Sequence, residues 1–294
     1  MAKIKKTTGE ILFDVFNYVL MLILSFAFIY PFWETLVNSF SSPVGAQRLG
    51  LKFYPIGFNL DSYINIFKSK YIFIGYYNTL YRTIIGTVLS VLVTYCGAYV
   101  LSKKNLPGRV VILFLITFTM FFSGGLIPSY LNMRRLNLIN TRWALILPGL
   151  TSAWNLIIAR NFIDSLPDSL EEAAIVDGAH PLIIVFRIML PISMPIIAVL
   201  ALWNAVGHWN SWFDANIYVR DPKKVVLQLV LRRVLIDDSR DMIGGDVLKA
   251  STASTTPETI KAATIIVSIV PIILFYPYLQ KYFVKGVMIG AIKG

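Results

Sequence analysis

Apolar residues along this chain gather in long blocks, and polar, turn-forming stretches separate the blocks. Each block is close to the roughly 20 residues that a helix needs to cross the hydrocarbon core of a bilayer. Their lengths and order predict an all-α, polytopic membrane protein, with six transmembrane helices in one transmembrane domain over residues 1–294. The expected spans cover residues 11–36, 77–101, 110–128, 143–163, 191–212 and 262–282.

The segments between the blocks predict how the spans connect. The turn from Lys103 to Arg109 is short and contains a Pro-Gly pair, so the second and third spans should form an antiparallel pair. The first block, from Ile11 to about Leu36, is too long for a signal-peptide core and is expected to be a retained span. An even number of spans places both termini on one side of the membrane.

Composition supports the membrane assignment and excludes several other classes. Hydrophobic residues make up 56% of the chain and charged residues only 15%. The net charge of +11 fits flanks that meet anionic lipid head groups, and no nucleic-acid partner is expected because no basic run is interleaved with aromatics on a soluble segment. Two His and one Cys make a metal site improbable. The chain contains no G-x-x-x-x-G-K-[ST] motif, so it has no P-loop of its own for ATP.

A polar, turn-prone segment lies between the fourth and fifth spans. Ser169 and Glu172 have the spacing of a capping box, which predicts a helix that begins at Ser169 and ends at Gly178. On this helix Leu170, Ala174 and Gly178 share a face that carries little bulk, so another backbone can approach it closely. One hypothesis is a helix that docks into a groove. The alternative is a cytoplasmic loop with a well-capped helix whose Glu residues serve the helix dipole.

The same segment carries a more specific pattern. It consists of Glu172-Ala173-Ala174, then Asp177-Gly178, then Ile188 and Leu190-Pro191. This pattern resembles the EAA loop of the permease subunits of ATP-binding-cassette (ABC) importers. The resemblance implies a coupling loop over residues 164–190 that contacts an ATPase. The coupling residues that it implies are Glu171, Glu172, Ala173, Ala174, Asp177 and Gly178.

Other stretches resemble one class within that family. The C-terminal pattern from Lys281 to Gly294, with Gly286 and Gly290, is similar to the ending of carbohydrate importer permeases of the maltose-type class. The region of Trp209 and the string that begins at Leu227 fit the branch that serves complex oligosaccharides. As a helix-dimer signal the two glycines are weak, because they lie beyond the apolar block.

The resemblance implies a type I importer in a bacterial cell membrane. Its expected partners are a second homologous permease subunit, two cytoplasmic ATPase subunits that hold ATP and Mg, and an extracytoplasmic sugar-binding protein that delivers an oligosaccharide. The chain itself would be no enzyme and would carry no cofactor. The coupling loop and both termini would face the cytoplasm. This orientation rests on the resemblance, because more of the 27 Lys and Arg residues then fall outside than inside, against the positive-inside rule.

Polar and aromatic residues crowd the end of the fifth span, which is costly in lipid unless they face other helices or water. Stacked aromatic rings and amide side chains suit a sugar, whose faces present C–H groups and whose rim presents hydroxyls. The alternative is an interfacial aromatic belt with interhelical hydrogen bonds. The candidate substrate-path residues are Asn204, His208, Trp209, Asn210 and Trp212.

Two rival functions would each need particular residues within the spans. A stand-alone secondary transporter or channel for a polar solute needs a buried carboxylate or an inverted repeat, and only Asp14 and Glu34 lie near a span interior. An intramembrane enzyme needs a nucleophile and base, and no plausible pair is present.

Basic residues of the predicted outer segments favour an anionic or bulky glycan, or an acidic face of the binding protein. They are Arg134, Arg135, Arg220, Lys223, Lys224, Arg232, Arg233 and Arg240.

Overall fold

The computed structural model describes residues 7–236 and 254–291, with side chains as far as residue 274. Within these ranges the regular structure is helical throughout. The chain divides into two compact units, Met1–Ser69 with Asp237–Ser268 and Lys70–Ile236 with Ile269–Gly294. Arg240 and the last three residues, which the sequence analysis drew on, lie outside the described residues.

The first unit contains α1 (Thr8–Ser39), α2 (Pro43–Gln47), α3 (Asp61–Lys68) and the start of α15 (Pro257–Ala291). Helix α1 is continuous and contains the first predicted span. Its capping box is formed by Thr7 and Glu10. The 18-residue apolar window of α1 contains no buried residue, as expected of a helix whose surroundings are lipid or another subunit.

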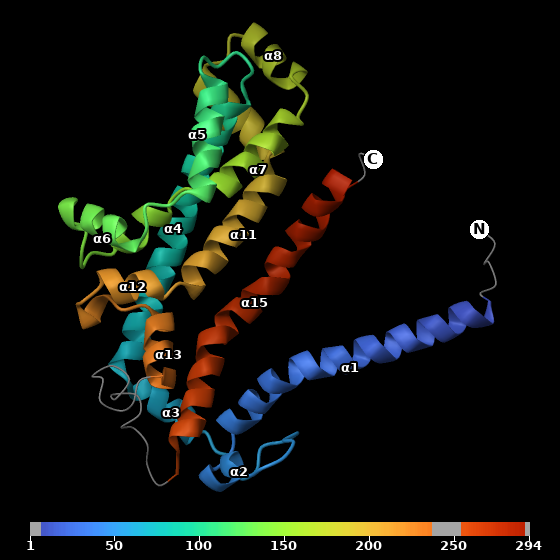
Figure 1. Cartoon of the computed structure of the whole chain (residues 1–294), viewed down its shortest axis with the longest axis vertical. Helices are drawn as coiled ribbons and strands as arrows, with labels where there is room; N and C mark the ends of the chain where they lie inside the picture. Colours follow the sequence, from blue (N-terminus) through green and yellow to red (C-terminus); the bar gives the residue numbers. More distant parts are fainter. Residues whose placement is uncertain (1–6, 237–253, 292–294) are drawn as a thin grey trace. The chain divides into compact units, whose positions relative to one another are not determined.

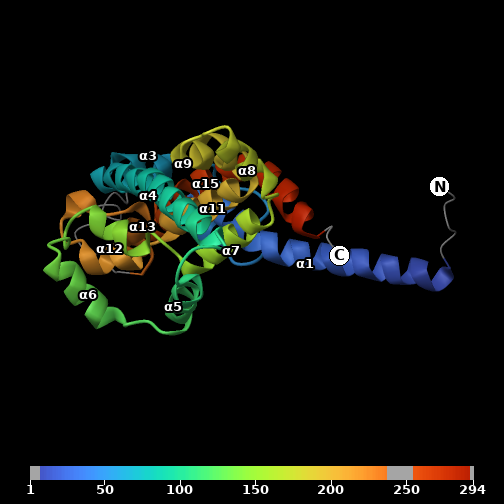
Figure 2. The same ribbon diagram turned by 90° about the horizontal axis from the view of Figure 1, so that it is seen from above.

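The second unit is built around α4 (Lys70–Ser102), which contains the second predicted span. Helices α7 (Ala153–Asp164) and α11 (Met194–Asn210) lie along α4 in both views (Figures 1 and 2). The core between them includes Tyr95, Ala98, Ala159, Ile163 and Leu200. Gly86 permits the closest approach, because a Cβ built there would lie 2.4 Å from Nε2 of His208.

The predicted third span is interrupted. Helix α5 (Arg109–Phe121) is followed by a four-residue break, and α6 (Leu126–Arg135) then turns away by 116°. Gly125 precedes α6 with a φ of +83°, in the region that glycine adopts without a Cβ penalty. The apolar block therefore ends before the expected residue 128, and α6 lies beside α12 (Phe213–Tyr218) (Figures 1 and 2).

The fourth predicted span, 143–163, is not one long helix. Its first half forms two short 3₁₀ turns, η1 (Trp143–Leu145) and η2 (Leu147–Gly149), and only α7 is α-helical, over 12 residues. Pro148 has no N–H to donate within a helix, and Gly149 lowers helix propensity further. Apolar content alone therefore overestimated the helix in this block.

The fifth predicted span, 191–212, is bent. The chain runs through α9 (Pro181–Ile183), the π-helical η3 (Ile184–Met189) and α10 (Leu190–Ile192), and α11 then starts at an angle of 82°. The sixth predicted span lies within α15, whose apolar window is Pro257–Leu274. By length and composition three described helices can cross a membrane, or up to five if each bent pair is one span. The count of six stays a prediction.

The charged segment that follows α11 is largely helical over residues 213–236. It forms α12, the 3₁₀ turn η4 (Pro222–Lys224) and α13 (Leu227–Ile236). Helix α13 packs on α4 through buried apolar side chains, including Leu227, Leu229 and Val230. Asn78 of α4 binds the entrance to α13, donating from Nδ2 to the carbonyls of Lys223 and Val225.

Candidate functional site

The segment that carries the EAA-like pattern forms α8 (Ser169–Val176) at one end of the second unit (Figure 1). The helix begins at the predicted residue, but its N-cap is Asp168 and no side chain caps it. The predicted capping box between Ser169 and Glu172 is therefore wrong, because Ser169 is the first residue of the helix and not its N-cap. The predicted end is confirmed: Gly178 follows α8 with a φ of +74°, and the N–H of Ala179 returns to the carbonyl of Ala174.

The small face of α8 is partly used by this chain itself. Ala174 is buried in the core cluster that includes Ile163 and Ile184, so it packs against side chains of its own unit. This corrects the expectation that Ala174 lies on the face left open for another protein. The exposed face of α8 instead carries Glu172, Ala173, Ile175 and Val176, and the side chain of Val176 is 87% exposed.

The two adjacent glutamates of α8 have different surroundings. Glu171 turns toward α4, where the Tyr99 hydroxyl donates to its Oε1 at 2.9 Å and Lys103 forms an ion pair with its Oε2. The Lys103 ammonium also lies 4.1 Å from the centre of the Tyr99 ring, within cation–π range. Glu172 is exposed. Glu171 therefore holds α8 in place, and Glu172 is available to a partner.

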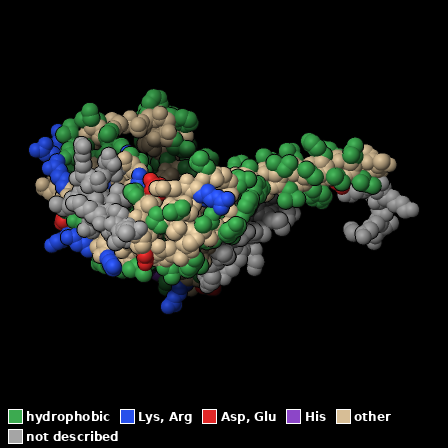
Figure 3. Space-filling view, turned by 90° about the horizontal axis from the view of Figure 1, so that it is seen from below, with side chains coloured by type: hydrophobic (Ala, Val, Ile, Leu, Met, Phe, Trp, Pro, Cys, Tyr) green, Lys and Arg blue, Asp and Glu red, His purple; other side chains and the backbone are tan. Residues whose placement is uncertain are grey.

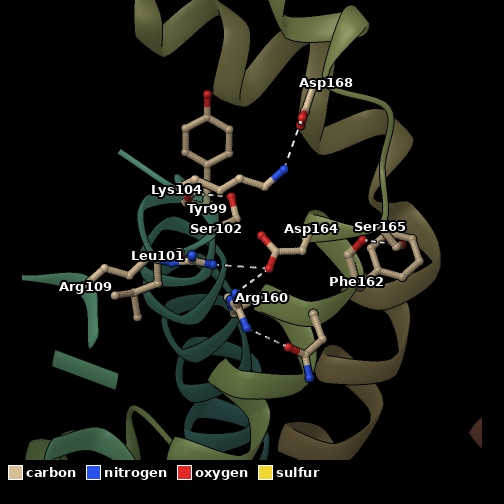
Figure 4. A network of polar contacts seen from close by, with 11 residues as sticks. Tyr99, Leu101, Ser102, Lys104, Arg109, Arg160, Phe162, Asp164, Ser165 and Asp168 are labelled. Atoms are coloured by element: carbon tan, nitrogen blue, oxygen red, sulfur yellow. Dashed lines mark hydrogen bonds and ion pairs between the residues drawn. The ribbon is translucent and has the colours of Figure 1, made fainter. Parts of the chain in front are cut away.

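Further ion pairs fix the segments on either side of α8 (Figure 4). Asp164, at the end of α7, lies between two guanidinium groups: Arg160 Nη2 at 2.5 Å and Arg109 Nη2 at 3.3 Å from its Oδ2. Arg109 also donates from Nε to the carbonyl of Leu101. The turn from α4 to α5 is thus joined to the end of α7, and that turn and α8 together line an open hollow of about 280 Å³.

We expect Glu171→Gln to weaken the attachment of α8 to the end of α4 without changing the exposed side chains of α8. The neutral side chain loses the Lys103 ion pair, at a cost of about 1 kcal/mol for a partly exposed charged hydrogen bond. Hydrogen exchange of the amides of residues 169–178 should become faster by several-fold. Glu172→Gln is the matched control and should leave this exchange unchanged, and equal exchange in both variants would contradict the different roles of the two residues.

A second polar site lies in the same unit, where α11 ends beside α4. It is an open hollow of about 460 Å³. The residues that line it are Arg82, Ala144, Leu145, Pro148, Gly149, Trp203, Asn204, Gly207, His208, Ser211, Phe213, Asp214 and Tyr218. The two 3₁₀ turns η1 and η2 contribute one side of this hollow, since Ala144, Leu145, Pro148 and Gly149 all line it.

An ion pair between a buried arginine and a partly exposed aspartate lines this hollow. Arg82 of α4 is 4% exposed and binds both carboxylate oxygens of Asp214 through Nη1 and Nη2. It also donates from Nε to Nδ1 of His208 at 3.4 Å and from Nη1 to the carbonyl of Ser211 at 3.2 Å. The four residues together connect α4 to the end of α11 and the start of α12.

The predicted substrate-path residues do not lie together. Asn204 and His208 line the hollow, and Asn204 donates from Nδ2 to the carbonyl of Leu200. Trp209 does not line it: its side chain is buried, with its ring centre 6.4 Å from that of Tyr76 on α4. Asn210 is exposed at the end of α11, and Trp212 lies under the Arg232 guanidinium at 3.9 Å.

Among the lining residues that sequence reasoning did not assign to the path are Arg82, Trp203 and Asp214. Arg82 carried a usable signal, because a charge inside an apolar block is costly unless it has a partner inside the protein. Asp214 is the one carboxylate directly after the fifth block, which makes it the natural partner. Trp203 stands within the predicted aromatic string, and only the helix register shows that it, rather than Trp209, faces the hollow.

Comparison with known proteins gives matches over nearly the whole chain, although no family model matches it. The chain is 39% identical over 284 residues to the polygalacturonan/rhamnogalacturonan transport system permease protein YtcP of Bacillus subtilis, covering 96% of this chain and 99% of that protein. It is 28% identical to the arabinooligosaccharides transport system permease protein AraQ of Halalkalibacterium halodurans, over 93% and 96% of the two chains.

A solved structure also matches this chain over nearly its whole length. It is the crystal structure of a bacterial ABC transporter involved in the import of the acidic polysaccharide alginate. One chain of that transporter is 33% identical to this chain, with a TM-score of 0.90, and the match covers 96% of this chain and 100% of the other. Sequence and structure therefore point to the same set of proteins.

Proposed function

Because the chain belongs to the permease subunits of ABC sugar importers, we propose that it forms, with a second permease, the membrane path for oligosaccharides that a binding protein delivers. The observation that carries the proposal is the position of α8. Glu171 and Ala174 fix this helix to its own unit, and Glu172, Ala173, Ile175 and Val176 stay exposed. A rigid helix with one open face can transmit a displacement from an ATPase to α4.

The remaining partners follow from this assignment. Two cytoplasmic ATPase subunits would hold ATP and Mg, and this chain would contribute no cofactor site. The coupling loop over 164–190 and both termini would face the cytoplasm, and six spans would cross the bacterial cell membrane. Lipid and the second permease would cover the apolar surfaces of α1 and α5, because the apolar window of α1 and all of α5 contain no buried residue in the described chain.

The hollow beside α11 is the candidate sugar path. Trp203 offers a ring face, and Asn204 and His208 offer polar atoms. Arg82 and Asp214 add one positive and one negative charge, so the pair contributes no net charge to the hollow. A stand-alone transporter is not favoured, since the matched proteins are parts of binding-protein-dependent systems and the single carboxylate in this hollow is already paired with Arg82.

The experiment that tests the function uses the assembled importer. The chain is co-expressed with its genetic neighbours, purified with the second permease and the ATPases, and reconstituted with the binding protein. We expect the binding protein with its oligosaccharide to stimulate ATP hydrolysis and to drive uptake. Uptake by the chain alone, without ATPase or binding protein, would contradict the proposal and support a stand-alone transporter.

Two tryptophans of α11 give a matched test of the path. Trp203→Ala should raise the apparent KM for uptake several-fold at normal membrane levels, since a lost stacking contact is worth about 1 kcal/mol. Trp209→Ala should instead lower the amount of folded complex, because truncating a buried Trp costs about 3–5 kcal/mol. Uptake kinetics normalised to the amount of complex separate the two. If the normalised kinetics changed only in Trp209→Ala, the path would lie on the other side of α11.

A further inference from the structure

A separate pocket of the second unit is lined almost entirely by polar side chains. It has a volume of about 370 Å³ and lies where α6 ends, the following turn passes and the chain leaves α12. The residues that line it are Tyr130, Arg134, Asn137, Ile139 and Arg220. In the view from below in Figure 3, Lys and Arg side chains lie in separate groups, the largest of them at the left edge. This pocket shares no lining residue with the hollow beside α11.

The walls of the pocket are held in place by contacts within the unit. The ring of Tyr130 stacks on that of Tyr218, with centres 6.2 Å apart and planes 14° from parallel. Arg220 donates from Nη2 to the Tyr130 hydroxyl at 3.3 Å. Oδ1 of Asn140 accepts the N–H groups of Arg220 and Asp221, at 3.1 and 2.9 Å. The backbone and the guanidinium of Arg220 are therefore both positioned before any ligand arrives.

The pocket carries positive charge that nothing in its walls balances. Neither Arg134 nor Arg220 forms an ion pair within the described residues, and the lining contains no carboxylate. The neighbouring Asp221 is occupied elsewhere: it accepts from the N–H of Lys223 at 2.9 Å and lies 3.6 Å from Lys224 Nζ. The Lys223 N–H and the Lys224 ammonium hold the pKa of Asp221 below its usual value, so its charge stays with those two residues.

We propose that this pocket binds a carboxylate of an acidic oligosaccharide, one built from uronic acid units. The proposal rests on the proposed function and names its substrate class. The planar fork of a guanidinium pairs with a carboxylate through two parallel hydrogen bonds. Tyr130 adds a hydroxyl and a ring face, Asn137 adds an amide, and the volume lies in the range of small-ligand sites. A neutral sugar would leave both cations unpaired on binding.

Binding of a defined probe to the full importer tests the proposal. The complex is placed in nanodiscs of neutral lipid, which removes anionic head groups, and binding of trigalacturonate is compared with that of its neutral methyl triester. The variants are Arg134→Gln, Arg220→Gln and both together, and Arg135→Gln is the control because it is exposed on the same helix but does not line the pocket. The side chain of Arg134 makes no hydrogen bond or ion pair in the described chain, and Gln keeps the backbone carbonyl that accepts from Asn137, so the change should leave the fold intact.

We expect each variant to weaken trigalacturonate binding about tenfold, the effect of one charged hydrogen bond. Binding of the methyl triester should not change, and Arg135→Gln should match the wild type. Equal loss for the neutral probe, or unchanged trigalacturonate binding in the double variant, would overturn the proposal. Sugar-free docking of the binding protein is measured alongside: if the variants abolish it, the pocket takes a carboxylate of that protein instead, and the proposal is wrong.

The same experiment separates this proposal from the proposed function. If the wild-type complex hydrolyses ATP faster with loaded binding protein but the arginine variants bind trigalacturonate normally, the importer assignment stands and the acidic-sugar pocket fails. If no oligosaccharide with its binding protein stimulates the wild-type complex, both fail together. Weaker probe binding at higher salt is expected as well, because screening reduces attraction at an exposed site.

Discussion

Gly178→Asp and Glu172→Lys should each abolish ATP hydrolysis stimulated by the binding protein, and uptake with it, in the reconstituted importer. Glu172 is exposed on α8, and its replacement reverses a charge on the face that is open to the ATPase. Gly178 has a φ of +74°, and a Cβ built there meets no atom of this chain within 4 Å. Since Asp tolerates this backbone conformation better than most residues, its effect should come from the partner rather than from a broken turn.

The magnitude separates coupling from a local effect on the helix. A lost helix-terminal interaction alone costs only about 1 kcal/mol, which a multi-helix membrane protein should absorb. Asp168→Asn is the matched control, because that carboxylate is 76% exposed and only weakly paired with Lys104. If both variants retained full stimulated hydrolysis and a full complement of bound ATPase, the coupling role of α8 would be wrong.

The second large effect should follow from breaking the ion pair between Arg82 and Asp214. Asp214→Asn leaves the nearly inaccessible Arg82 charge without its partner, and we expect a loss of about 3 kcal/mol in stability. Arg82→Met should cost less, because the Asp214 side chain is 25% exposed and keeps the Ser211 hydroxyl and the Ala215 N–H as donors. Thermal unfolding of the purified complex in nanodiscs measures both.

A double variant decides whether charge is the cause. Arg82→Met with Asp214→Leu removes both charges, and replacement of a buried pair by apolar groups is often neutral in stability. We therefore expect the double variant to be more stable than Asp214→Asn alone. A double variant that is no more stable than Asp214→Asn would mean that packing around His208, rather than the unpaired charge, is what the single changes disturb.

The apolar blocks of the sequence determined that the chain is helical and lies in a membrane, because covering a backbone in lipid requires helices of that length and composition. They also placed α1, α4 and α15 correctly, since each is long and free of internal breaks strong enough to end it. The local EAA-like pattern located α8, and Gly178 marked its end, because a left-handed residue is a local requirement.

Tertiary structure decided which side of each helix does what. The sequence contains two adjacent glutamates, but only the approach of Tyr99 and Lys103 turns Glu171 inward and leaves Glu172 outside. Helical register around α4 likewise buries Trp209 and turns Trp203 toward the hollow. Pairing of Arg82 with Asp214 joins residues 132 positions apart, a contact that no local pattern specifies. Side-chain environment depends on which distant surfaces meet, and that is settled only when the helices pack.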